Sequence, residues 1–91
     1  MGNKITAVRY ISESRELEVT FSSGARLGCP VDSLKMLDWT GSKFVPAPRP
    51  TDEQLSNVRI WAGGYAVDFP EIRQNFDVGE LLAFLPVTTE A

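Results

Sequence analysis

The sequence contains no histidine and a single cysteine, Cys29. Without histidine, the chain lacks the commonest general base, the imidazole of hydrolytic triads and a ligand of most zinc sites. One cysteine cannot form an internal disulfide, and its place at the end of an apolar segment predicts a buried thiol. A reactive thiol would instead need an exposed, electropositive setting. We therefore predict no metal, no cofactor and no enzymatic activity.

Long apolar runs and positive charge are also scarce. No run reaches the roughly 18 apolar residues that a membrane-spanning helix needs, and the N-terminal residues do not read as a signal peptide. We therefore expect a cytoplasmic protein without a membrane partner. The net charge of −3 disfavours a nucleic-acid surface. However, Arg9, Arg15 and Arg26 gather near the N-terminus, so a nucleic-acid-associated regulatory role stays open as an alternative.

The first thirty residues carry a strand pattern. Residues 4–11 are rich in β-branched and aromatic side chains, and Leu17, Val19 and Phe21 then alternate with polar residues. Gly24 can supply the turn into a third short strand at residues 25–29. We predict an antiparallel β-meander with one buried face. The length of 91 residues indicates a single domain over residues 1–91, with residues 86–91 as a tail.

The middle of the chain is less regular. Residues 31–37 predict one or two helical turns, with Asp32 or Ser33 as the N-cap. Residues 41–50 contain three prolines and predict an extended loop. The proline-rich 44–50 loop is either a spacer or a binding element, because it superficially resembles ligands of proline-binding domains. Thr51 and Gln54 form a capping box that predicts one further helical turn.

The C-terminal half predicts two strands and a helix. Strands at 58–61 and 65–69 flank a Gly63-Gly64 turn, and a capping box of Asp77 and Glu80 begins a helix that runs to about Leu85. The predicted fold class is α+β: an antiparallel β-meander plus a second β-hairpin, packed by a short C-terminal helix and one or two helical turns. The predicted core consists of Leu17, Val19, Phe21, Leu27, Val67, Phe69, Leu81, Leu82 and Leu85.

Two carboxylates flank the Phe69-Pro70 corner. Asp68 and Glu71 are the acid–base candidates that helix capping does not explain, and a small hydrolase using both is the least favoured function. The structural alternative places Asp68 on the solvent face of a strand and Glu71 in a turn.

The tryptophans and two arginines are the candidate partner-binding residues. Trp and Arg are favoured at interaction hot spots, and Trp61 stands close to Arg59 on a strand that already gives one face to the core. Alternatively, Trp61 covers the Gly-Gly turn or packs under residues 44–45. With Trp39 before the proline-rich loop and Arg73 after the corner, the predicted binding residues are Arg59, Trp61, Trp39 and Arg73.

The order of these elements resembles a known bacterial family. The matching segments are residues 21–24, 51–55, 64–65, 69–72 and 78–82, and together they resemble the domain of unknown function 2442 family. Arg73-Gln74-Asn75 replaces a corner that is acidic in the family, and the proline-rich loop is longer. The resemblance implies a small α+β fold of bacterial or phage origin. It also implies an association with gene pairs of the toxin–antitoxin kind.

From these observations we hypothesise a non-enzymatic protein-interaction module, antitoxin-like or inhibitor-like, that acts by binding another protein. Homodimerisation through an exposed strand edge remains open.

Overall fold

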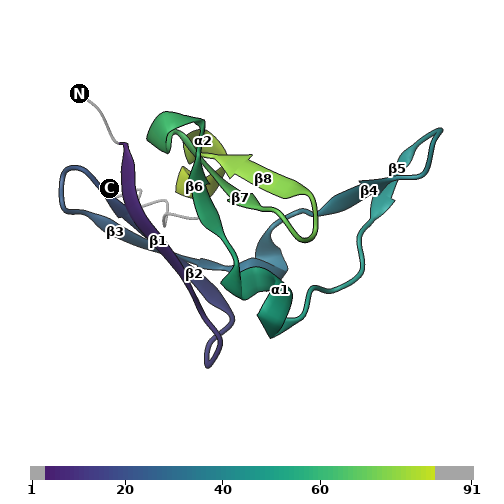
Figure 1. The fold of residues 1–91 in the computed structure, drawn as a ribbon, viewed down its shortest axis with the longest axis horizontal. Coiled ribbons are helices and arrows are strands. Elements are labelled where there is room, and N and C mark those ends of the chain that lie inside the picture. The colour runs from purple at the N-terminus through teal and green to yellow at the C-terminus, as the bar shows by residue number, and fades with distance from the viewer. Residues whose placement is uncertain (1–3, 84–91) are drawn as a thin grey trace, which may run out of the picture.

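The computed structural model describes residues 4–83 of the chain. Its N-terminal layer is the predicted meander of β1 (Ile5–Ile11), β2 (Glu16–Phe21) and β3 (Arg26–Pro30), all antiparallel (Figure 1). The register pairs Val19 with Val8 on one side and with Leu27 on the other. Because side chains alternate along a strand, these residues share the buried face, and the acidic residues of β2 point outward.

A second antiparallel sheet packs against the meander. It contains β6 (Arg59–Trp61), the 3₁₀ turn η2 (Ala62–Gly64), β7 (Ala66–Phe69) and β8 (Gln74–Asp77), with β7 in the centre. The predicted hairpin forms its first two strands, and β8 is an addition to the prediction. Arg73 adopts a positive φ of 55° at the turn before β8, which lets the chain reverse after the Pro70 corner. The α+β fold class is confirmed.

Both predicted capping boxes are present. The Thr51 hydroxyl accepts a hydrogen bond from the Gln54 amide at 3.2 Å at the start of α1 (Asp52–Ser56). The Asp77 carboxylate accepts one from the Glu80 amide at 2.8 Å at the start of α2 (Val78–Leu82). The predicted end of this helix at Leu85 and the predicted tail at 86–91 lie outside the described residues. Between residues 4 and 83, no helix has the length and apolar character needed to cross a membrane.

The predictions for residues 31–50 were wrong in part. Residues 31–37 contain a single 3₁₀ turn, η1 (Val31–Ser33), which follows Pro30 and has no side-chain cap from Asp32 or Ser33. The chain then extends into β4 (Leu37–Trp39), which pairs with β5 (Phe44–Pro46). The predicted extended loop therefore contains a strand. Pro46 is compatible with it because both strands of a two-stranded ladder are edges.

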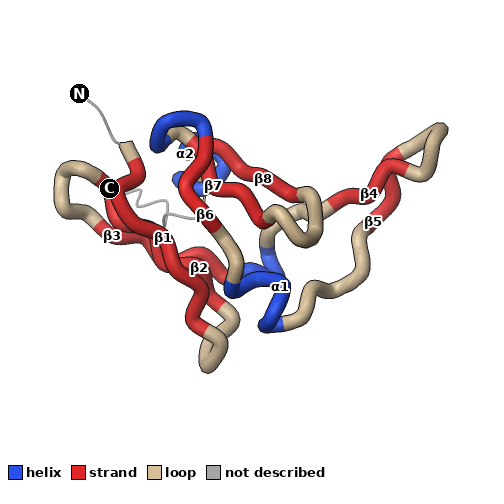
Figure 2. The backbone as a smooth tube through the Cα atoms, in the orientation of Figure 1, coloured by secondary structure: helices blue, strands red, loops and turns tan. Residues whose placement is uncertain are grey.

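One hydrophobic cluster joins the two sheets and the short helical elements. Figure 2 shows how these strands and short helices are arranged along the backbone. Most of the predicted core is confirmed: Leu17, Val19, Phe21, Leu27, Val67, Phe69 and Leu81 are buried. Leu82 is only half-buried against the cluster, and Leu85 lies outside the described residues. The predicted burial of Cys29 is confirmed, and the structure adds Ile5, Val31, Leu34, Leu55 and Phe76 to the core.

The molecule measures 42 × 30 × 28 Å, and the β4–β5 hairpin projects from the body along its longest axis (Figure 1). An isolated two-stranded hairpin is at best marginally stable in water. Its orientation must therefore depend on contacts at its base.

Candidate functional site

One face of the β4–β5 hairpin is apolar and exposed. The register places Leu37 opposite Pro46 and Trp39 opposite Phe44, so these four side chains share one face, which we call the hairpin face. The rings of Trp39 and Phe44 are in contact at a centroid distance of 4.9 Å, with their planes tilted by 58°. Trp39 is nevertheless 58% exposed and Phe44 63% exposed. Two large aromatic side chains that project from the body are an uncommon use of apolar surface in a chain of this size.

The side-chain amide of Gln74 anchors the base of the hairpin. Its Nε2 donates to the Leu37 carbonyl at 2.8 Å, and its Oε1 accepts from the Leu37 amide at 3.4 Å. Gln74 is itself buried at the start of β8. The amide therefore satisfies both backbone groups of Leu37 and ties β4 to the second sheet.

A charged cluster anchors the chain that leaves the hairpin. Arg15 donates to the two Asp32 carboxylate oxygens at 2.9 Å each, and Arg49 donates to the same oxygens at 3.2 and 3.0 Å. The hydrogen bonds from Arg15, and then those from Arg49, hold the pKa of Asp32 well below its usual range. Asp32 therefore stays ionised between the two guanidinium groups.

The same cluster reaches α1 and β1. Arg15 also donates to the Pro50 carbonyl at 3.1 Å and to Asp52 at 3.2 Å, and the Tyr10 hydroxyl donates to Asp52 at 2.5 Å. Burial and the hydrogen bond to Asp52 raise the pKa of Tyr10. Together with Gln74, this cluster fixes both ends of the 37–50 segment to the body.

An open hollow of about 500 Å³ lies beside the hairpin face. Arg73, from the turn before β8, and Gln74, the first residue of β8, form its opposite wall. Among residues 4–83, Arg73 forms no ion pair. The structure thus brings together two of the four predicted binding residues, Trp39 and Arg73, around one hollow.

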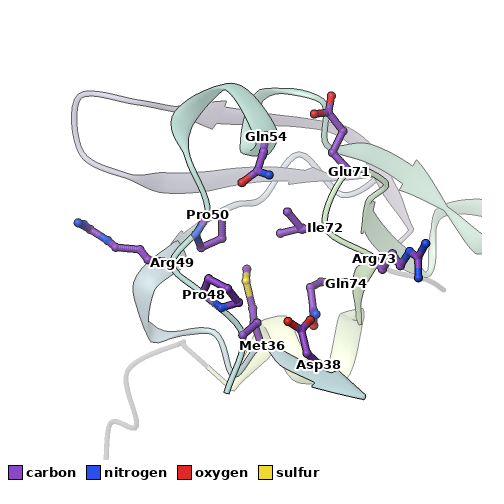
Figure 3. A pocket seen from close by; sticks show the side chains of 11 residues that line it. Met36, Asp38, Pro48, Arg49, Pro50, Gln54, Glu71, Ile72, Arg73 and Gln74 are labelled. Carbon is purple, nitrogen blue, oxygen red and sulfur yellow. The ribbon is translucent and has the colours of Figure 1, made fainter. Parts of the chain in front are cut away.

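A second hollow, of about 260 Å³, lies nearer the body and shares Asp38, Arg73 and Gln74 with the first. In Figure 3 the side chains of Ile72, Met36 and the prolines lie around its centre. The charged ends of Arg73 and Glu71 point away from that centre. The two hollows are therefore contiguous, and the smaller one is apolar at its centre with charged side chains at its rim.

Arg59 and Trp61 lie elsewhere, together on one face of β6. Trp61 is 45% exposed and stands opposite Ala66, and Arg59 stands opposite Asp68. Arg59 donates to the Asp68 carboxylate at 2.9 Å. The interpretation of Asp68 as a solvent-facing side chain was wrong, because the central strand of the sheet and its arginine partner leave it only 8% exposed.

The structure gives Asp68 and Glu71 separate partners. Asp68 is paired with Arg59, whereas Glu71 accepts a hydrogen bond from the Asn57 amide and lines the smaller hollow. Asp68 does not line that hollow. A shared acid–base site for the two carboxylates has no support from this arrangement.

The arginines of the meander are largely neutralised. Arg9 donates to Glu18 at 2.7 Å across the outer face of the sheet, and Arg15 is held by Asp32 and Asp52. Only Arg26 of the three lacks an ion pair within residues 4–83. The alternative of a basic face built from these arginines is weakened.

Cys29 is expected to be unreactive in the folded protein. It is fully buried, and burial, with a smaller contribution from Glu16, raises the pKa of its thiol to about 11. At pH 8 the thiolate is therefore scarce and inaccessible. We expect an aromatic disulfide reagent to label the native protein at least about 100-fold more slowly than the protein in denaturant. Rapid labelling without denaturant would contradict the burial of this side chain.

Sequence reasoning missed Phe44 and Leu37 as members of the site. The sequence offers only a weak signal, a glycine at Gly41 between two short segments that each carry an aromatic residue, because strands of three residues are too short to show a period. Because residues 46, 48 and 50 are prolines, an extended loop was predicted here instead.

Comparison with known proteins identifies a similar fold but gives no information on function. No family model and no curated protein matches the chain. A crystal structure of a protein of unknown function from Rhodospirillum rubrum is similar, with a TM-score of 0.70 over 98% of this chain and 95% of its own. The two sequences are 19% identical, so the similarity extends to the fold alone. Membership of the domain of unknown function 2442 family stays a prediction.

Proposed function

We propose that this protein is a non-enzymatic protein-interaction module whose hairpin face contacts another protein. The observation that supports this most directly is the Trp39–Phe44 ring pair, which is exposed on a projecting hairpin whose base is anchored by Gln74 and Asp32. Aromatic and arginine side chains dominate the energetics of protein interfaces. A fixed orientation also reduces the entropy that binding must overcome.

An antitoxin-like or inhibitor-like action is the form of this proposal that the family resemblance implies. The face that carries Arg59 and Trp61 is the competing contact surface. The arginine of that surface is already paired with Asp68, so it is not available to a partner. Beside the hairpin face, Arg73 lines the same hollow as the exposed rings and forms no ion pair within residues 4–83.

Trp39→Ala is expected to weaken binding of the cognate partner by about 2 kcal/mol or more, which is roughly 30-fold. The partner would be recovered by quantitative co-purification from the native cells, produced separately and titrated by calorimetry. Trp61→Ala is the matched control, and we expect it to change the dissociation constant less than about threefold. The reverse ranking would place the interface on β6, and recovery of no stoichiometric partner would contradict the module itself.

A further inference from the structure

The charge around the hairpin is opposite to that of the whole chain. Residues 35–50 contain three basic residues and one acidic residue, for a net charge of +2, whereas the full chain carries −3. Arg73 adds a further positive charge from the opposite wall of the hollow. Such a local excess favours association with negatively charged groups.

Not all of these cations are available to a partner. Arg49 is engaged by Asp32, while Arg73, Lys35 and Lys43 form no ion pair within residues 4–83. Of these three, Arg73 lines the hollow together with Trp39 and Phe44. A free guanidinium beside exposed aromatic rings can bind a carboxylate in a bidentate manner while the rings bury an apolar group.

Two fixed anions limit how much negative charge the surface accepts. Asp38 lines both hollows and has no ion-pair partner among the described residues, and Glu71 lines the smaller one. A strand of nucleic acid would bring one phosphate per nucleotide past these carboxylates. The arrangement therefore suits a single carboxylate with an adjoining apolar side chain, and disfavours a polyanion.

From this geometry we propose that the partner presents a short peptide segment in which an apolar side chain adjoins one carboxylate. The apolar side chain lies in the hollow of about 500 Å³ against Trp39 and Phe44, and the carboxylate pairs with Arg73. This inference rests on the proposed function and specifies the chemistry of the partner at the hairpin face. Arg73 is thus a specificity-determining residue, and it occupies the position at which the resembled family is acidic.

The test is a selection from a phage-displayed library of random dodecapeptides against the full chain. A Trp39→Ala variant serves for counter-selection. We expect enriched peptides to place Asp or Glu next to an aromatic or aliphatic residue. Their synthetic versions would then be titrated by fluorescence anisotropy against the wild type and Arg73→Gln. Arg26→Gln, which removes another unpaired arginine on the meander, is the matched control, and circular dichroism would verify that all variants are folded.

Arg73→Gln is expected to lower peptide affinity about tenfold or more, and Arg26→Gln less than about threefold. Replacing the peptide carboxylate by its amide should lower the affinity of the wild type by the same factor and leave the affinity of Arg73→Gln almost unchanged. A double-mutant cycle requires this result for a direct pair. An absence of enrichment, enriched peptides without carboxylates, or tighter Arg73-dependent binding of a thymidine oligonucleotide would overturn the inference. A cognate complex that is lost with Trp39→Ala but unchanged with Arg73→Gln would also overturn it, and would leave the proposed function standing.

Discussion

Phe69→Ala is expected to destabilise the protein by about 3–5 kcal/mol, which is a large fraction of the stability of a domain of this size. Phe69 is fully buried on the central strand of the second sheet, and its ring meets Phe76 edge-on at a centroid distance of 6.2 Å. Removing the ring leaves a cavity between the two sheets that the rigid strands around it cannot fill. Urea unfolding followed by circular dichroism would measure the loss.

The matched control is the same substitution at Phe44. That ring is 63% exposed and contacts Trp39, so Phe44→Ala should cost about 1 kcal/mol or less of folding stability. If the hairpin face is the contact surface, Phe44→Ala keeps the fold and weakens partner binding. Equal destabilisation by the two substitutions would contradict the placement of Phe69 in the core and of Phe44 outside it.

This contrast between the two phenylalanines also shows what the sequence can predict. Phe69 is one of the predicted core residues, since it belongs to the alternating pattern of residues 65–69, which Pro70 terminates. The two capping boxes were predictable for a similar reason, because each depends on side chains only three residues apart. Features that depend on short-range patterns or on a strict period of two can be predicted from the sequence alone.

The missed elements depend on distant partners. Strands β4, β5 and β8 have three or four residues each, too few to establish a period, and their identity as strands comes from pairing. The anchoring role of Gln74 needs Leu37, which is 37 residues away in the sequence. Asp32 appeared to be a helix cap, and its two arginine partners each lie 17 residues from it.

Individual residues of the candidate site could be predicted from the sequence, but their arrangement in space could not. Trp39 and Arg73 were both selected from the sequence by residue type, yet nothing in the sequence indicates that they line one hollow. Arg59 and Trp61 were selected by the same reasoning and lie on a different strand. Residue type therefore identifies candidates, and the topology decides which of them can act together.

Gly64→Ala is expected to destabilise the protein by about 2–5 kcal/mol, combining backbone strain with a steric clash. Gly64 has a φ of 102°, which alanine rarely adopts, and a Cβ added there would lie 3.2 Å from the Ile5 carbonyl oxygen and 3.3 Å from the Lys4 Cβ. The nearest obstacle is the backbone of β1, so a side-chain rearrangement cannot relieve it. The close approach of this turn to β1 helps to hold the two sheets together.

The neighbouring glycine separates these two contributions. Gly63 has a φ of 68° and open space around its Cβ position, so Gly63→Ala should cost only the left-handed strain of about 1–2 kcal/mol. The difference between the two variants in urea unfolding then measures the contact between the turn and β1, together with the extra strain of the larger φ at Gly64. Equal losses at both positions would mean that strain alone acts there, and that the meander and the second sheet do not depend on this contact.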